Sequence, residues 1–168
     1  MAMQVLVLLC VKADLESVES LKLAPGCRFC LDLRESGGAE TREKVYVDGS
    51  EEHELPGSRG TAHFAMKWSK DSKHMASVNV EKELKGVIQQ GVTSDDQGAY
   101  VPLVGFECRG IEPIAWHPEN EFVVQGVSGQ TWEDVDLSEK EWFEYDEKSG
   151  ESVSVTDLDY EFRVHKGK

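Results

Sequence analysis

Short segments in which apolar and polar residues alternate follow one another along almost the whole chain, and this pattern leaves few folds open to it. Gly, Pro, Asp and Ser residues separate the segments, as they do at turns between strands. The candidate strands are residues 4–11, 27–33, 44–47, 62–68, 76–80, 101–108, 122–126, 142–145, 151–155 and 160–164. In "EYDEKSGESVSV", residues 144–155, the turn-forming residues Lys148, Ser149 and Gly150 predict a hairpin.

A helical period is hard to find in this sequence. Ser138, followed by Glu141 three residues later, has the pattern of a capping box, which supports at most one helical turn. Without helices to carry the chain across a sheet, neighbouring strands are expected to run antiparallel. The sequence therefore predicts an all-β fold of antiparallel, sandwich-like sheets.

Two parts of the sequence resemble each other, which indicates an internal duplication. Residues 18–33 align with residues 111–126, and the alignment matches one Glu, one Pro and one Phe in the two segments. The polar residues 89–98 would then be a linker between the halves. We expect a single domain, residues 1–168, made of two similar β lobes, residues 1–88 and residues 99–168, related by an approximate two-fold axis.

The distribution of charge argues against nucleic acid as a partner. The formal net charge is −14, and residues 101–168 contain 16 Asp and Glu residues against 6 Lys and Arg residues. Phosphate binding needs a basic surface, so the expected partner is an unknown protein, basic if the acidic residues take part in binding. A solvated acidic face that aids solubility is the alternative explanation of this charge.

The apolar residues 4–11 do not have the features of a signal peptide. The run is short, no Lys or Arg precedes it, and Asp14 and Glu16 follow it at once, so we expect a buried strand there. No stretch reaches the ~20 apolar residues that a membrane-spanning helix needs, which predicts no membrane partner. The four cysteines are then expected to be reduced thiols in the cytoplasm.

The sequence "CRFC", residues 27–30, has the spacing of half a zinc site but makes a poor one. A structural zinc site usually has four ligands, and no second cysteine pair exists in the chain. Positions three apart on a strand point to opposite faces, so the two sulfur atoms are expected to diverge. A redox dithiol would more typically open a helix that lowers the thiol pKa, and nothing helical follows here.

Three segments carry a recognisable signature: "SRGTA" (residues 58–62), "FECRGIEP" (residues 106–113) and "DLSEKEWFEYDEKSGESVSV" (residues 136–155). With them the chain resembles the eukaryotic family of CXXC-motif-containing zinc-binding proteins, long classed as a domain of unknown function. The resemblance extends over nearly the whole chain. It implies an all-β fold with an internal duplication, and a cytosolic, non-catalytic protein whose relatives bind zinc.

The resemblance also implies where the zinc ligands of the family lie. One cysteine pair follows the strand that corresponds to residues 28–33, at positions that are Glu35 and Gly38 here. The second pair follows the strand that corresponds to residues 62–67, at Trp68 and Asp71. All four thiolates are replaced, and two carboxylates make at best a weak site for a hard cation. The chain is therefore expected to have lost its zinc site and to hold no cofactor.

The zinc ion of the family would connect two hairpin turns, so its loss has to be offset elsewhere in the fold. We expect the side chain of Trp68 to pack across the gap between the turns. We also expect Glu35 or Asp71 to form an ion pair with a nearby cation, which would be Lys67, Lys70 or Arg34.

An acidic and aromatic cluster in the C-terminal half is the candidate interaction surface. Its aromatic members are Trp132, Trp142, Phe143 and Tyr145, and its acidic members are Glu133, Asp134, Asp136, Glu144 and Asp146. Trp132, Trp142, Tyr145 and Asp146 are the residues expected to form the surface. An acidic rim around exposed aromatic rings would suit a basic partner. The alternative is that Trp142 and Tyr145 are hydrophobic anchors of a strand pair.

Together these features predict a non-catalytic protein-interaction or scaffold module, a degenerate member of a zinc-binding family. One alternative is a metal-binding protein that uses substituted ligands. A second is a thiol redox protein that uses Cys27 and Cys30.

Overall fold

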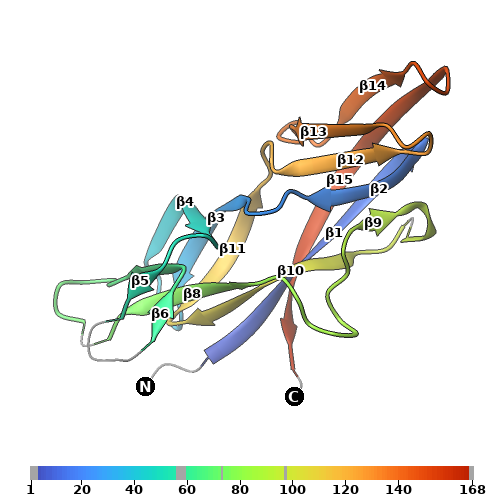
Figure 1. Ribbon diagram of the computed structural model, residues 1–168. Coiled ribbons are helices and arrows are strands. Elements are labelled where there is room, and N and C mark those ends of the chain that lie inside the picture. The colour runs from blue at the N-terminus through green and yellow to red at the C-terminus, as the bar shows by residue number, and fades with distance from the viewer. Residues whose placement is uncertain (1–3, 56–59, 73, 97, 167–168) are drawn as a thin grey trace.

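A six-stranded antiparallel sheet runs the length of the molecule (Figure 1). The computed structural model describes residues 4–55, 60–72, 74–96 and 98–166, so the first part of the SRGTA motif lies outside the described residues. The strand order in the long sheet is β14 (Trp142–Asp146), β15 (Glu151–His165), β1 (Gln4–Glu16), β10 (Val101–Arg109), β8 (Ala76–Glu81) and β7 (Phe64–Met66). The apolar run near the start of the chain lies in β1, in the middle of this sheet, and residues 7–11 are all buried, as the sequence predicts.

Two smaller antiparallel sheets follow one another along the long sheet (Figure 1). The first consists of β11 (Ile111–His117), β3 (Arg28–Glu35) and β4 (Thr41–Asp48). The second consists of β13 (Thr131–Val135), β12 (Phe122–Gly126), β2 (Val18–Leu23) and β9 (Val92–Thr93). A short pair, β5 (His53–Glu54) with β6 (Thr61–Ala62), and the 3-10 turn η1 (Ser94–Asp96) complete the described elements.

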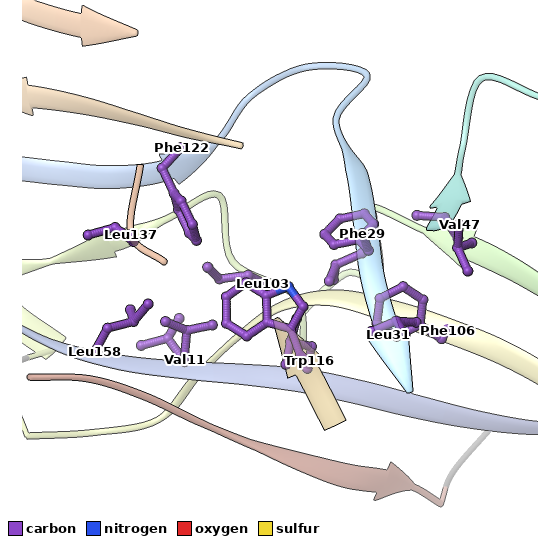
Figure 2. Close-up of a cluster of buried hydrophobic side chains, with 14 of the residues drawn as sticks. Val11, Phe29, Leu31, Val47, Leu103, Phe106, Trp116, Phe122, Leu137 and Leu158 are labelled. Carbon is purple, nitrogen blue, oxygen red and sulfur yellow. The ribbon is translucent and has the colours of Figure 1, made fainter. Parts of the chain in front are cut away.

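The hydrophobic core lies between the long sheet and the two smaller sheets (Figure 2). Phe29 of β3 meets Phe106 of β10 with ring centroids 5.3 Å apart. Trp116 of β11 meets Tyr160 of β15 with ring centroids 5.4 Å apart. Both contacts are edge-to-face and join a small sheet to the long one. The all-β, antiparallel, sandwich-like fold predicted from the sequence is confirmed.

Two predicted strands, residues 151–155 and 160–164, are one continuous strand, β15. The intervening Asp-Leu-Asp resembles a turn in sequence, but Asp157 has a φ of 52° and the register with β1 shifts between Lys12 and Asp14. Such a bulge lets a strand pass an irregular segment without ending.

Two further predictions need correction. The predicted strand 62–68 is divided between β6 and β7, and β7 ends at Met66. The predicted linker 89–98 contains β9 and η1, and Val92 of β9 is buried in the core. The segment is otherwise polar, so its composition did not indicate that Val92 fixes it to the core.

Strands of the two predicted lobes, residues 1–88 and 99–168, are interleaved rather than separate. Each of the three larger sheets contains strands from both lobes, and the buried apolar side chains form one cluster. The similar segments pair crosswise: β2 pairs with β12, and β3 pairs with β11. An approximate two-fold axis between the two halves would produce this crosswise pairing. The internal duplication itself stays a prediction.

Among the described residues there is no helix with the length and apolar character needed to cross a membrane.

Candidate functional site

The first two positions predicted to replace zinc ligands lie in the turn between β3 and β4. Glu35 is the last residue of β3, and its amide donates to the carbonyl oxygen of Glu40 over 2.9 Å. The amide of Gly38 donates to the carbonyl oxygen of Glu35 over 3.0 Å. Gly37 has a φ of 73°, which glycine adopts without strain. The local sequence therefore forms a tight turn that brings residues 35 and 38 together.

The other two positions lie in the segment between β7 and β8. A turn forms there because the amide of Ser72 donates to the carbonyl oxygen of Ser69 over 3.2 Å, and the amide of Ser69 donates to the hydroxyl of Ser72 over 3.2 Å. Asp71 is exposed in this turn. Trp68 is half-buried and packs against the core.

The carbonyl oxygen of Gly110 connects the two turns. It accepts a hydrogen bond from Nε1 of Trp68 over 2.8 Å and one from the amide of Ser36 over 3.3 Å. Gly110 lies between β10 and β11 and has a φ of 70°. The guanidinium of Arg42, on β4, lies 5.8 Å from the centre of the Trp68 ring, within range of a cation–π contact. The indole is thus joined to the β3–β4 turn through a shared acceptor, and the packing of Trp68 across the gap stays a prediction.

The ion pairs expected for Glu35 and Asp71 do not occur among the described residues. Arg34 instead forms a salt bridge with Glu112, with 2.5 Å between Nη2 and Oε1. The reason is register, because Arg34 of β3 lies directly opposite Glu112 of β11. Both side chains are nearly half exposed, so the pair contributes about 0–1 kcal/mol.

The residues in these turns do not fit a zinc ion. A structural zinc ion is held by four Cys, His, Asp or Glu side chains in a tetrahedron. Gly38 has no side chain, and the indole of Trp68 offers an N–H group that already donates to Gly110. Only the carboxylates of Glu35 and Asp71 remain. Within the described part of the chain, no group of three or more His, Cys, Asp and Glu residues is placed to hold a metal ion.

Cys27 and Cys30 lie in surroundings that suppress thiol reactivity. Cys30 is buried on β3 opposite Tyr46, and Cys27 is half-buried just before the strand. Burial raises the pKa of Cys27 to about 11 and also raises the pKa of Cys30. Both thiols are therefore protonated at neutral pH, and a protonated thiol is a poor nucleophile.

The predicted interaction cluster divides into a structural part and an exposed part. Trp132 of β13 and Trp142 of β14 are half-buried and make an edge-to-face contact, with ring centroids 5.4 Å apart. The alternative interpretation, in which Trp142 and Tyr145 are both anchors of a strand pair, therefore agrees with the structure for Trp142 and not for Tyr145. Tyr145 is 56% exposed, and Phe143, on the same strand, is 63% exposed. These two rings form the exposed part.

Asp146, predicted to lie on the surface, is fully buried. Its carboxylate accepts hydrogen bonds from the hydroxyl of Ser128 and from the amide of Lys148, the latter over 2.9 Å. These bonds hold the pKa of Asp146 below its usual range. Ser128 belongs to the turn between β12 and β13, so Asp146 ties the β14–β15 hairpin to the neighbouring sheet. The sequence did not reveal this because an acid before Glu-Lys-Ser-Gly is typical of an exposed turn.

The Asp146→Asn substitution is expected to destabilise the protein at neutral pH by an amount that disappears in acid. A carboxyl group with a lowered folded pKa stabilises the fold above its unfolded pKa, and this contribution is lost as the pH falls through the folded pKa. Urea denaturation of both proteins from neutral pH down to about pH 2 measures the difference. The exposed Glu147→Gln substitution is the matched control. A difference that stays constant over this range would show that the charge of Asp146 has no part in the effect.

Gly110 and Arg42 are members of the Trp68 site that the sequence did not identify. Gly110 lies in the FECRGIEP motif, but no sequence signal marks its carbonyl oxygen as the acceptor for a residue 42 positions away. Arg42 lies in the polar run 41–44 at the start of β4, and nothing in that run marks it as a neighbour of Trp68.

Comparison with known sequences gives the same family as the sequence motifs. The model of the family described as "CXXC motif containing zinc binding protein, eukaryotic" matches residues 8–163. The CXXC motif containing zinc binding protein of Rattus norvegicus is 33% identical over 155 residues, which cover 90% of this chain and 94% of the relative. A UPF0587 protein of Drosophila melanogaster is 36% identical over 156 residues, which cover 90% of each chain.

Solved structures share the fold over nearly its full length. A hypothetical protein from Plasmodium falciparum superimposes with a TM-score of 0.86 at 30% identity, over 94% of this chain and 99% of that chain. The crystal structure of C1orf123 superimposes with a TM-score of 0.82 at 30% identity, over 94% of this chain and 98% of that chain. Sequence and fold agree, and the chain belongs to the eukaryotic family of CXXC motif containing zinc binding proteins.

Proposed function

We propose that this chain is a zinc-free member of its family that acts in the cytoplasm by binding another protein, without catalysis of its own. The observation that supports this most is the position of Trp68. Its indole N–H group donates to the carbonyl oxygen of Gly110, which also accepts the amide of Ser36 from the other turn that would carry a cysteine pair. The side chain that replaces a ligand therefore joins the two turns through a shared acceptor.

A hydrogen bond and a buried ring can take over the structural task of a metal ion in a chain of this size. A structural zinc ion contributes ~10–16 kcal/mol in small zinc-finger peptides, which have almost no core of their own. This chain has an extended core between its sheets. The fold therefore needs only the stabilising free energy that holds two turns in place. A partly buried Trp with one hydrogen bond contributes about 2–3 kcal/mol.

Metal binding through substituted ligands is the second candidate, and it is favoured by the zinc binding after which the family is named. Its donors would be Glu35 and Asp71, two carboxylates that suit a hard cation rather than zinc. Thiol redox activity has less support, because burial raises the pKa of Cys27 and of Cys30.

Protein binding is supported by the surface rather than by the turns. Phe143 and Tyr145 are large aromatic residues with more than half of their area exposed, next to an excess of acidic residues. Exposed aromatic rings of this kind are enriched at protein–protein interfaces. The net charge of −14 favours a basic protein over a nucleic acid.

Protein purified without added metal is expected to contain far less than one zinc ion per chain, and a strong chelator is expected to leave its thermal unfolding unchanged. The reason is that the two turns offer no four-ligand set. Elemental analysis and calorimetry measure the two quantities. A relative with intact cysteine pairs, purified in the same way, is the control and should lose stability with the chelator. Near-stoichiometric zinc in this chain would instead establish binding through substituted ligands.

A further inference from the structure

The outer side of β14 is an open sheet edge. β14 is the first strand of the six-stranded sheet, and among the described residues it pairs only with β15 (Figure 1). The amide of Tyr145 donates to Oε1 of Glu144 over 3.3 Å rather than to a strand, so it faces away from β15. Backbone groups alternate along a strand, so the amide and carbonyl of Phe143 face the same open side. Such an edge is a template for one more strand.

The open edge carries two uncovered aromatic rings. Phe143 and Tyr145 are two residues apart and therefore lie on one face of the sheet. Their cross-strand neighbours on β15 are Ser154 and Ser152, which are too small to cover them. Edges of soluble proteins are usually protected by charges, prolines or bulges, and paired exposed rings on an edge are typical of a binding surface.

Side-chain contacts on the opposite face of β14, and at its end, hold this edge strand in place. On the opposite face of β14, Trp142 packs against Trp132 of β13. At the end of the strand, the buried Asp146 is bonded to Ser128 in the turn after β12. An added strand would therefore meet a preorganised backbone and would lose little free energy in ordering it.

The charge around the edge selects the kind of strand that binds. Residues 133–151 contain nine Asp and Glu residues and two Lys residues. Glu144 lies on the edge strand itself, and Glu133 and Asp134 are exposed on neighbouring β13. Lys and Arg side chains on one face of an added strand would meet these carboxylates, and Val and Thr side chains on its other face would pack against the aromatic rings. A second copy of this chain is disfavoured, since each copy carries a net charge of −14.

We propose that the β14 edge, residues 142–146, binds a basic extended segment of a partner protein as an additional strand of the long sheet. The inference rests on the proposed function, since it names the surface and the chemistry of the partner through which the chain acts. Main-chain hydrogen bonds supply affinity in this binding mode, and the alternating side chains supply specificity.

The test uses the full chain and a fluorescently labelled peptide of about ten residues in which Lys and Arg alternate with Val and Thr. Anisotropy is expected to show saturable binding that weakens with added salt. Amide chemical shifts are expected to move mainly in residues 142–146. The same peptide with N-methyl groups on alternate amides keeps its charge but cannot pair as a strand, and it is expected to bind at least about tenfold more weakly. Equal binding of the two peptides would overturn strand addition.

Variants of the chain separate this edge from general acidity. Phe143→Thr combined with Tyr145→Thr keeps residues that favour a strand and is expected to weaken binding at least about tenfold. The matched control combines Ile114→Thr with Val164→Thr, which removes two other exposed apolar side chains and is expected to bind like the wild type. The two peptides are compared on the wild-type chain, which needs no variant. The proposal can therefore still be refuted if either double variant folds poorly.

Three outcomes would overturn this assignment. The first is unchanged peptide binding to the Phe143→Thr, Tyr145→Thr variant. The second is self-association of the wild type that this variant abolishes, which would make a second copy the occupant. The third is a partner captured equally well by the wild type and the variant, in which case the proposed function stands and the β14 edge does not.

Discussion

Trp68→Ala is expected to lower the free energy of unfolding by about 2–3 kcal/mol. The substitution removes a half-buried indole, together with its hydrogen bond to the carbonyl oxygen of Gly110. It also removes the ring beneath the guanidinium of Arg42. Gly110 keeps its bond from Ser36, so no buried acceptor is left without a partner. Urea denaturation followed by far-ultraviolet circular dichroism measures the change.

Two further variants show which part of the Trp68 side chain matters. Trp68→Phe keeps most of the buried ring area and loses the N–H group, so it is expected to cost about 1 kcal/mol. Phe143→Ala removes an aromatic ring that is 63% exposed and is expected to change stability by less than about 0.5 kcal/mol. If Trp68→Ala had as small an effect as Phe143→Ala, the turns would be held by something other than the indole.

The combined variant E35C/G38C/W68C/D71C is expected to bind about one zinc ion per chain and to become unstable without it. Its four thiolates would lie on two turns that already meet at Gly110. A side chain at position 38 would collide with Glu35, because Oε1 of Glu35 lies 2.5 Å from an added Cβ atom. The change at position 35 removes that obstacle, so the two substitutions in the first turn act together.

Zinc content by elemental analysis and the chelator dependence of unfolding measure this gain. The serine counterpart, E35S/G38S/W68S/D71S, is the matched control, because it makes the same changes of size without a thiolate. It is expected to bind no zinc and to be less stable than the wild type, since it too lacks the indole. A cysteine variant that folds but holds no zinc would show that these four positions are not arranged as a metal site.

Local patterns predicted the regular parts of the fold. Residues 122–126 alternate between buried and partly exposed positions, and the predicted strand agrees with β12 at both ends. The hairpin at Lys148, Ser149 and Gly150 was equally clear, because Gly150 supplies the positive φ that the turn requires. Both features depend only on neighbouring residues.

Irregular strands were harder to predict from local patterns. β11 contains Pro113, a residue type that is excluded from central strands, and the structure accommodates it because β11 is an edge strand with a register shift between Pro113 and Ala115. β2 contains the buried Ser20, which interrupts its apolar pattern. In each case the pairing partner, which is far away in sequence, decided the outcome.

The candidate sites show the same limit. Trp68 could be singled out because it stands at a position where the relatives' pattern has a ligand. Its acceptor on Gly110 could not, since the sequence does not show which carbonyl groups are close in space. Asp146 was placed on the surface because charged residues are mostly exposed, and only the approach of Ser128 makes its burial favourable.

The central position of β1 has a consequence for how the protein is made. Gln4 pairs with Arg109 and Leu6 pairs with His165, so both partners of β1 leave the ribosome long after β1 itself. During that interval the apolar run of β1 has no native neighbour and is open to association with other nascent chains. The yield of this protein in a cell is therefore expected to depend on how well chaperones shield its first strand until β15 has been translated.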